Sequence, residues 1–185
     1  MQVEYKFYEP NKGWEEIQAN LYNNVLERMP YSVFHPVNAE RIKERFNYEK
    51  KDPQMIRYAI SESGEPLAYI QASLSGNQVW IGYPWGVEKC PPEVQEKLFS
   101  DLFTYVKEKY PDKELVMGYI SKSWQAMHDF AKKHGFEISD IADFYGIELD
   151  AVSKPSDFSS PYSCRIATVE DVPILLEISE ADPTL

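Results

Sequence analysis

Three consecutive runs with strand-like alternation constrain the fold of this chain more than any other part of the sequence. Residues 55–61, 66–74 and 78–85 are rich in aromatic and β-branched residues, and the short segments SESGE and SGN separate them. Connections this short join antiparallel neighbours, so the runs predict an antiparallel meander. Pro84 cannot donate a ladder hydrogen bond, which predicts a bulge or splayed strand end near Tyr83 and Trp85.

Helical and strand patterns flank this meander on both sides. The strand–helix–strand alternation after it predicts a parallel crossover, so the sheet should be mixed, mostly antiparallel, and flanked by helices. The helix after the meander starts with a proline, and the last one is capped by Ser123 and stopped by Gly135. The expected elements are a strand over 3–8, helices over 14–30, 38–47, 92–110 and 123–135, a buried strand over 114–120, and a closing β segment over 136–149.

Composition limits the partners that this chain can have. Thirty acidic and nineteen basic residues give a formal charge of −11, which repels nucleic acids and anionic membranes and would attract a small cationic amine, although an acidic surface also serves solubility. Cys90 and Cys164 lie far apart without metal-ligand spacing, so we expect neither a disulfide framework nor a metal site. The N-terminus has no signal-peptide pattern, and we expect a cytoplasmic protein.

Two segments resemble a known family. Residues 123–140 end a helix with Lys133, one spacer, Gly135 and Phe136, and this run resembles the corresponding part of the GNAT (Gcn5-related N-acetyltransferase) superfamily. Residues 162–178 are similar to the opening strand and first helix of GNAT domains, and Thr168 with Asp171 forms a capping-box-like start. The resemblance implies an α/β (mixed α+β) acyl-CoA N-acyltransferase fold.

The second similar segment also implies a tandem protein. We expect a GNAT-like domain over residues 1–150, a linker over 151–161, and the truncated start of a second GNAT-like domain over 162–185, which would make the C-terminal second domain a partner of the first. Residues 170–179 should form a short helix with Pro173 in its first turn. We expect this helix to pack against the domain or a neighbouring chain.

The resemblance places the pyrophosphate of acetyl-CoA at the loop before the helix over 92–110. In the family this loop is glycine-rich, and its backbone amides hold the anion. Here Pro91 and Pro92 remove two donors, while Glu88 and Glu93 add negative charge. Lys89 and Lys97 could supply positive charge that compensates for these changes, or they could be solvated surface residues. Cys90 is either a nucleophile or a buried, inert thiol. The expected cofactor contacts are Tyr83, Trp85, Gly86, Val87 and Lys89.

The resemblance also locates the catalytic groups, and none can be assigned here. The family's general acid is often a tyrosine four residues before the Gly-Phe pair, a position that Ala131 occupies here. An alanine side chain has no transferable proton. An acid would have to come from His128, His134, Tyr83 or Tyr119. Glu40, Glu44 and Glu49 could face an amine acceptor or could form a solvated helix face.

Three functions therefore remain open. In the first, the chain belongs to a tandem acetyltransferase, in which this domain is weak or inactive and the second domain carries the chemistry. In the second, this domain binds acyl-CoA through the strand splay and acetylates a small cationic amine. In the third, it is a non-catalytic module that uses an aromatic cleft at Tyr83, Trp85 and Trp124 to bind a ligand or a partner domain.

Overall fold

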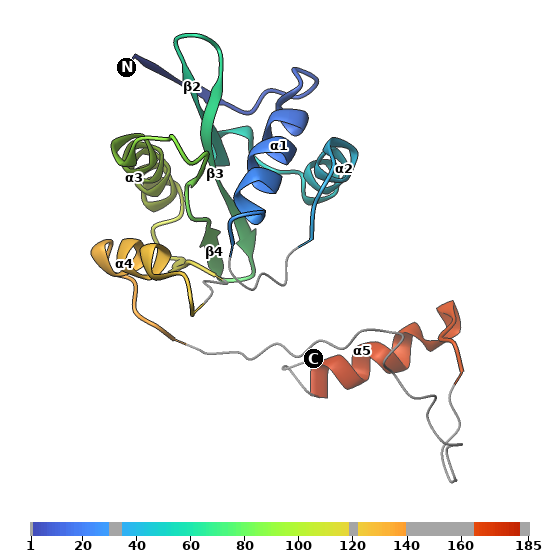
Figure 1. Ribbon diagram of the computed structural model, residues 1–185. Coiled ribbons are helices and arrows are strands. Elements are labelled where there is room, and N and C mark those ends of the chain that lie inside the picture. The colour runs from blue at the N-terminus through green and yellow to red at the C-terminus, as the bar shows by residue number, and fades with distance from the viewer. Residues whose placement is uncertain (1, 30–34, 119–121, 140–164, 182–185) are drawn as a thin grey trace. The chain divides into compact units, whose positions relative to one another are not determined.

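The computed structural model describes residues 2–29, 35–118, 122–139 and 165–181 (Figure 1). Helices and strands follow one another largely as the periodicities predict. Their bounds are β1 Val3–Phe7, α1 Trp14–Leu26, α2 Ala39–Glu49, the short 3-10 helix η1 Pro53–Met55, β2 Ile56–Ser61, β3 Pro66–Ser75, β4 Gln78–Ile81, β5 Trp85–Gly86, α3 Pro92–Lys109, β6 Glu114–Val116, α4 Gln125–Lys133, the 3-10 helix η3 Val169–Asp171 and α5 Val172–Ala181.

One mixed sheet organises the first part of the chain. Its strand order is β1-β2-β3-β4-β6, with β5 paired to β3. All neighbours are antiparallel except β4 and β6, which run parallel and are joined through α3. The structure thus confirms the antiparallel meander, the parallel crossover and the predicted fold class, a mixed, mostly antiparallel sheet flanked by helices.

Helices cover both faces of this sheet (Figure 1). On one face α1 and α2 enclose a core in which Trp14 stacks on Tyr58 with ring centroids 4.5 Å apart. On the other face α3 and α4 pack through Leu98, Phe99 and Phe130. The amphipathic stripes of the helices thus account for two separate cores, one on each side of the sheet.

The face under α1 also buries polar groups that hydrogen-bond to one another. The Tyr8 hydroxyl donates to Glu15 Oε1 over 2.6 Å, and the Tyr58 hydroxyl donates to Gln18 Oε1 over 2.8 Å. Glu15 is only 6% exposed, and burial together with this carboxylate raises the pKa of Tyr8 above its usual range. These bonds satisfy groups that would otherwise be costly to bury.

Three details differ from the sequence expectations. Of the strand expected over 114–120, Glu114 to Val116 pair with β4 at one edge of the described sheet and are only partly buried. Residues 117–118 form no strand, and residues 119–120 lie outside the described residues. Trp124 occupies the N-cap position of α4, so the expected cap at Ser123 is wrong, whereas Gly135 ends the helix at φ +80° as predicted. Residues 136–139 form no strand, and the rest of the expected closing β segment lies outside the described residues.

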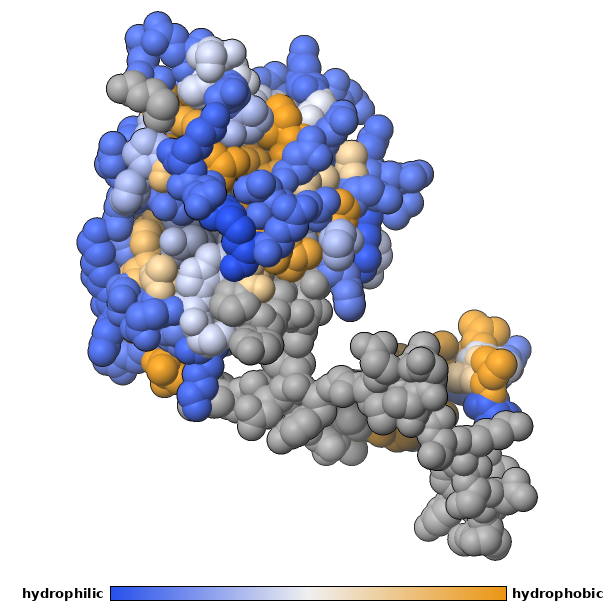
Figure 2. All heavy atoms as spheres, viewed as in Figure 1, coloured by the Kyte–Doolittle hydropathy of each residue, from blue (hydrophilic) through white to orange (hydrophobic). Residues whose placement is uncertain are grey.

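Residues 143–185 group apart from residues 1–142 and are described by themselves. Their described part consists of η3 and α5, with the predicted capping box between Thr168 and Asp171 and with Pro173 at the second residue of α5. Apolar side chains lie at the surface of this segment (Figure 2), among them Ile174 at 57% and Leu176 at 58% exposure. The helix is as expected; its packing and the boundaries at residues 150 and 161 stay predictions.

None of the helices within the described residues is long and apolar enough to cross a membrane. Nor do the described histidine, cysteine and carboxylate side chains group in a way that could hold a metal ion.

Candidate functional site

A one-residue bulge lies where β4 leads into β5. Both strands pair with β3, with Ala72 opposite Ile81 in β4 and Tyr69 opposite Trp85 in β5. The four steps from Ile81 to Trp85 therefore lie opposite three steps in β3, from Ala72 to Tyr69. The extra residue falls in the segment that contains Tyr83 and Pro84. This confirms the bulge that Pro84 predicts, because a residue without an N–H is tolerated where the ladder is interrupted.

The sheet opens at the same level. The parallel pairing of β4 with β6 ends at Trp80 opposite Val116. Among the described residues, the strand pairing from Ile81 to Gly86 is with β3. Gly118 lies directly beside Trp80, since a Cβ built on Gly118 would stand 2.2 Å from Trp80 Cζ3. The predicted splay near Tyr83–Val87 is therefore present among the described residues.

Aromatic rings gather at this opening. The ring centroid of Tyr83 lies 5.7 Å from that of Trp85 and 6.5 Å from that of Trp124, and the two tryptophans are 6.0 Å apart. Tyr83 also meets Phe130 of α4 edge-to-face at 5.1 Å. The three residues of the predicted aromatic cleft are thus brought together, but as rings in mutual contact and each partly exposed.

The N-terminus of α3, which follows the opening, offers few backbone donors. Pro91 is its N-cap and Pro92 its first residue, so neither has an N–H. The amide of Val87 donates to Leu67 O, that of Cys90 to Val87 O, and that of Val94 to Pro91 O. Proline and internal hydrogen bonds together leave this helix end poorly suited to hold an anion.

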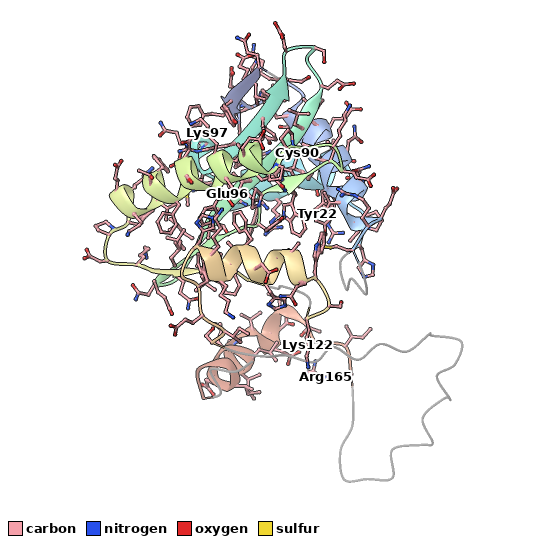
Figure 3. All side chains as sticks on the ribbon, turned by 60° about the vertical axis from the view of Figure 1, so that its left-hand side comes forward. Tyr22, Cys90, Glu96, Lys97, Lys122 and Arg165 are labelled. Atoms are coloured by element: carbon pink, nitrogen blue, oxygen red, sulfur yellow. The ribbon has the colours of Figure 1, made fainter. Side chains whose placement is uncertain are left out.

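The nearby lysines are also engaged. Lys89 Nζ pairs with Glu65 Oε2 of the β2–β3 turn over 2.7 Å, and Lys97 pairs with Asp101 within α3 over 2.9 Å. Figure 3 shows Lys97 on the side of α3 away from α4, whereas Glu96 faces α4 and bonds Lys133 and His134 there. Glu65 was missed by the sequence reasoning, because only the fold brings the turn beside the loop.

Cys90 is a packed thiol. It is 8% exposed, its Cβ would stand 3.0 Å from a Cβ built on Gly86, and burial raises its pKa to about 11. The nearby Glu93 acts in the same direction. A thiol with this pKa is protonated at neutral pH, which favours the inert alternative for Cys90 over the nucleophile.

Two hollows lie elsewhere on the first unit. One, of about 430 Å³, is lined by the β2–β3 turn and Lys89. The other, of about 370 Å³, lies between the C-terminal half of α3, Leu115 and Phe136. Neither is lined by Tyr83, Trp85 or Trp124.

Solved structures share this architecture. A GCN5-related N-acetyltransferase from Sphaerobacter thermophilus superposes with a TM-score of 0.57 at 16% identity, over 72% of this chain and 40% of that one. PaiA N-acetyltransferase from Thermoplasma acidophilum, in complex with coenzyme A, gives 0.57 at 14%, over 77% of this chain and 94% of that one. An aminoglycoside acetyltransferase from an uncultured soil metagenomic sample, in complex with sisomicin, gives 0.56 at 15%, over 79% and 97%.

This is the fold of the GNAT acetyltransferases. The fold identified from the Gly-Phe segment is therefore confirmed, whereas the tandem arrangement stays a prediction. No model of a known protein family matches the sequence, and no curated protein matches it either.

On the GNAT fold, the residues of this chain do not fit the pyrophosphate of acyl-CoA. The helix end has prolines in place of donors, its neighbouring lysine is paired with Glu65, and Glu93 stands in its first turn. An anion there would meet a carboxylate and few N–H groups.

The candidate acids are dispersed. Ala131 is 7% exposed and packs in the core as part of α4. Tyr83 alone of the candidates in the described residues lies at the bulge, where burial raises the pKa of its hydroxyl and Gln95 hydrogen-bonds it. His134 Nε2 lies 3.0 Å from Glu96 Oε2 and His128 lies on α4, while Tyr119 falls outside the described residues.

The candidate bases do not converge either. Glu40 and Glu44 are exposed and lie on the side of α2 opposite its buried residues Ile42 and Phe46, and the side chain of Glu49 is outside the described set. The solvated-face alternative therefore explains Glu40 and Glu44. Among the described residues, the carboxylate that the fold buries is Glu15. Sequence reasoning missed it because its partner Tyr8 lies outside α1, seven positions earlier.

Proposed function

We propose that this chain contributes a weakly active or inactive GNAT-fold domain to a protein that transfers an acyl group from acetyl-CoA to an amine. In this proposal a C-terminal second domain performs the chemistry. The observation that carries it is the N-terminus of α3, where Pro91 and Pro92 replace the donors that an anion needs. The paired Lys89 and the buried Ala131 support the same conclusion.

The tandem part of the proposal is supported by the second unit. Residues 162–178 are similar to the opening of a GNAT domain, and the described part forms a capped helix with apolar residues on its surface. Apolar surface of this kind is typical of a helix that belongs against a sheet. The rest of a second GNAT-like domain would supply that sheet.

A second candidate function rests on the aromatic rings at the bulge. Tyr83, Trp85 and Trp124 gather partly exposed aromatic rings at one place on a protein of charge −11, an arrangement that favours a small cationic amine. In this alternative the domain is a non-catalytic binding module. A methylated ammonium compound titrated into the chain would bind the wild type and fail to bind a Trp124→Ala variant.

Calorimetric titration of acetyl-CoA into the purified chain tests the leading proposal. We expect no binding tighter than about 100 µM, a free energy near −5.5 kcal/mol. Binding in the low micromolar range would refute the proposal, because it would require a functional pyrophosphate site.

A matched pair of variants identifies the cause of weak binding. Glu65→Gln frees Lys89, and Pro92→Ala restores one amide at the helix end, so their combination should bind acetyl-CoA more tightly than the wild type. Glu62→Gln, an exposed carboxylate of the same turn, serves as the control with an equal change of charge. If Glu62→Gln raises the affinity for acetyl-CoA as much as the combined variant does, net charge and not the local donors sets that affinity.

A further inference from the structure

The outer edge of β5 has backbone acceptors that face away from β3. The amide of Val87 donates to Leu67 O in β3. In a trans peptide unit the N–H and C=O point in opposite directions, so the Gly86 carbonyl of the same unit points away from β3. Alternate residues of a strand repeat this direction, which places the Pro84 carbonyl on the same side. Within the described residues no strand pairs with this side of β5.

Two side chains bind these carbonyls. Arg28 Nη2, just after α1, donates to Gly86 O over 2.6 Å, and Gln95 Nε2 of α3 donates to Pro84 O over 2.7 Å. The two donors come from helices on opposite faces of the sheet (Figure 1). Arg28 has a second contact, because its Nε donates to the Asn24 carbonyl over 3.3 Å.

Carbonyls along an open strand edge are the groups that an added extended chain pairs with. When side chains already satisfy them, an incoming chain must first displace those side chains. A short hydrogen bond from a charged guanidinium is stronger than a neutral one, so the Gly86 carbonyl is the harder of the two to free.

We infer that Arg28 and Gln95 cap an edge of β5 that would otherwise pair with an extended ligand carrying amide N–H groups, the pantetheine arm of an acyl-CoA. Each side chain stands where a ligand amide would donate. This inference rests on the proposed function, since it adds a second reason for weak acyl-CoA binding beside the α3 N-terminus.

The test uses pantetheine, which has two amides and no phosphate, so the pyrophosphate position does not enter the result. Arg28→Met with Gln95→Leu keeps an aliphatic side chain at each position and removes both donors. We expect the double variant to bind pantetheine at least about tenfold more tightly than the wild type, a change of about 1.4 kcal/mol. Backbone amide NMR signals of Trp85, Gly86 and Val87 should shift on binding.

Arg41→Met is the matched control, because it removes the same charge from an exposed side chain of α2. An unchanged affinity in a folded double variant, or an equal gain in the control, overturns the inference. Should the double variant fail to fold, NMR of the wild type tests the inference. We expect the Arg28 guanidinium N–H groups to exchange slowly with water and to rotate slowly. A freely rotating guanidinium overturns the inference. Low-micromolar acetyl-CoA binding by the wild type would instead refute the proposed function.

Discussion

At the scale of single residues, Tyr58 joins the sheet to α1 by a buried hydrogen bond. Its hydroxyl donates to Gln18 Oε1 over 2.8 Å, and burial raises its pKa above the usual range. Tyr58→Phe keeps the ring that stacks on Trp14 and leaves Gln18 Oε1 without this donor. We expect the free energy of unfolding in urea to fall by about 1 kcal/mol. Tyr48→Phe, at 89% exposure, should change nothing, and equal effects would contradict this account.

Asp52 supports a prediction about pH. Burial raises the pKa of Asp52, but hydrogen bonds from Lys109 and Tyr105 outweigh burial and leave the pKa below its ordinary value of 3.8. A lowered carboxyl pKa stabilises the fold above the unfolded-state pKa, and this stabilisation is lost as pH falls through the folded-state value. Wild type should therefore exceed Asp52→Asn in unfolding free energy at pH 7, by less than about 1 kcal/mol for this partly exposed pair. The gap should close below about pH 3.8. Urea titrations from pH 7 to pH 3 measure this, and a pH-independent gap would exclude it.

At the scale of elements, the parallel pair of β4 and β6 depends on a glycine. A Cβ on Gly118 would stand 2.2 Å from the Trp80 ring, so Gly118→Ala must displace that ring. We expect a loss of about 1–3 kcal/mol in unfolding free energy. In a Trp80→Leu background the same substitution should cost less, because the obstructing ring is gone. Additive losses in this double-mutant cycle would show that the glycine acts through the backbone alone.

The elements also show what sequence patterns can predict. Alternation predicted β2, β3 and β4, and Pro84 predicted the bulge, because each of these signals records a local preference of the backbone or a local pattern of burial. The contacts that close the site join distant residues, as Arg28 and Gly86 do across 58 positions and Lys89 and Glu65 do across 24. Such pairs leave no local pattern, so the capped edge and the paired lysine could not be predicted. The length of β6 could not be predicted either, since it depends on how far its pairing with β4 extends.

At the scale of the whole molecule, the described buried core lies between Tyr8 and Ala131. A chain that ends at residue 150 should therefore keep the urea midpoint and cooperativity of the full chain, since it loses no described core residue. Denaturation of the two chains followed by circular dichroism measures this. A clear drop in the midpoint of the shorter chain would place stabilising contacts in residues 151–185 and would contradict the predicted domain boundary.

The buried thiol of Cys90 allows the opening rate of the loop before α3 to be measured. The thiol is 8% exposed and its raised pKa of about 11 keeps it protonated, so we expect an alkylating reagent at neutral pH to label it mainly when the loop opens. In a Cys164→Ser variant Cys90 is the one remaining thiol, so the labelling rate reports how often the loop opens. A ligand that binds along β5 would lower the labelling rate of Cys90 even where its heat of binding is too small to detect.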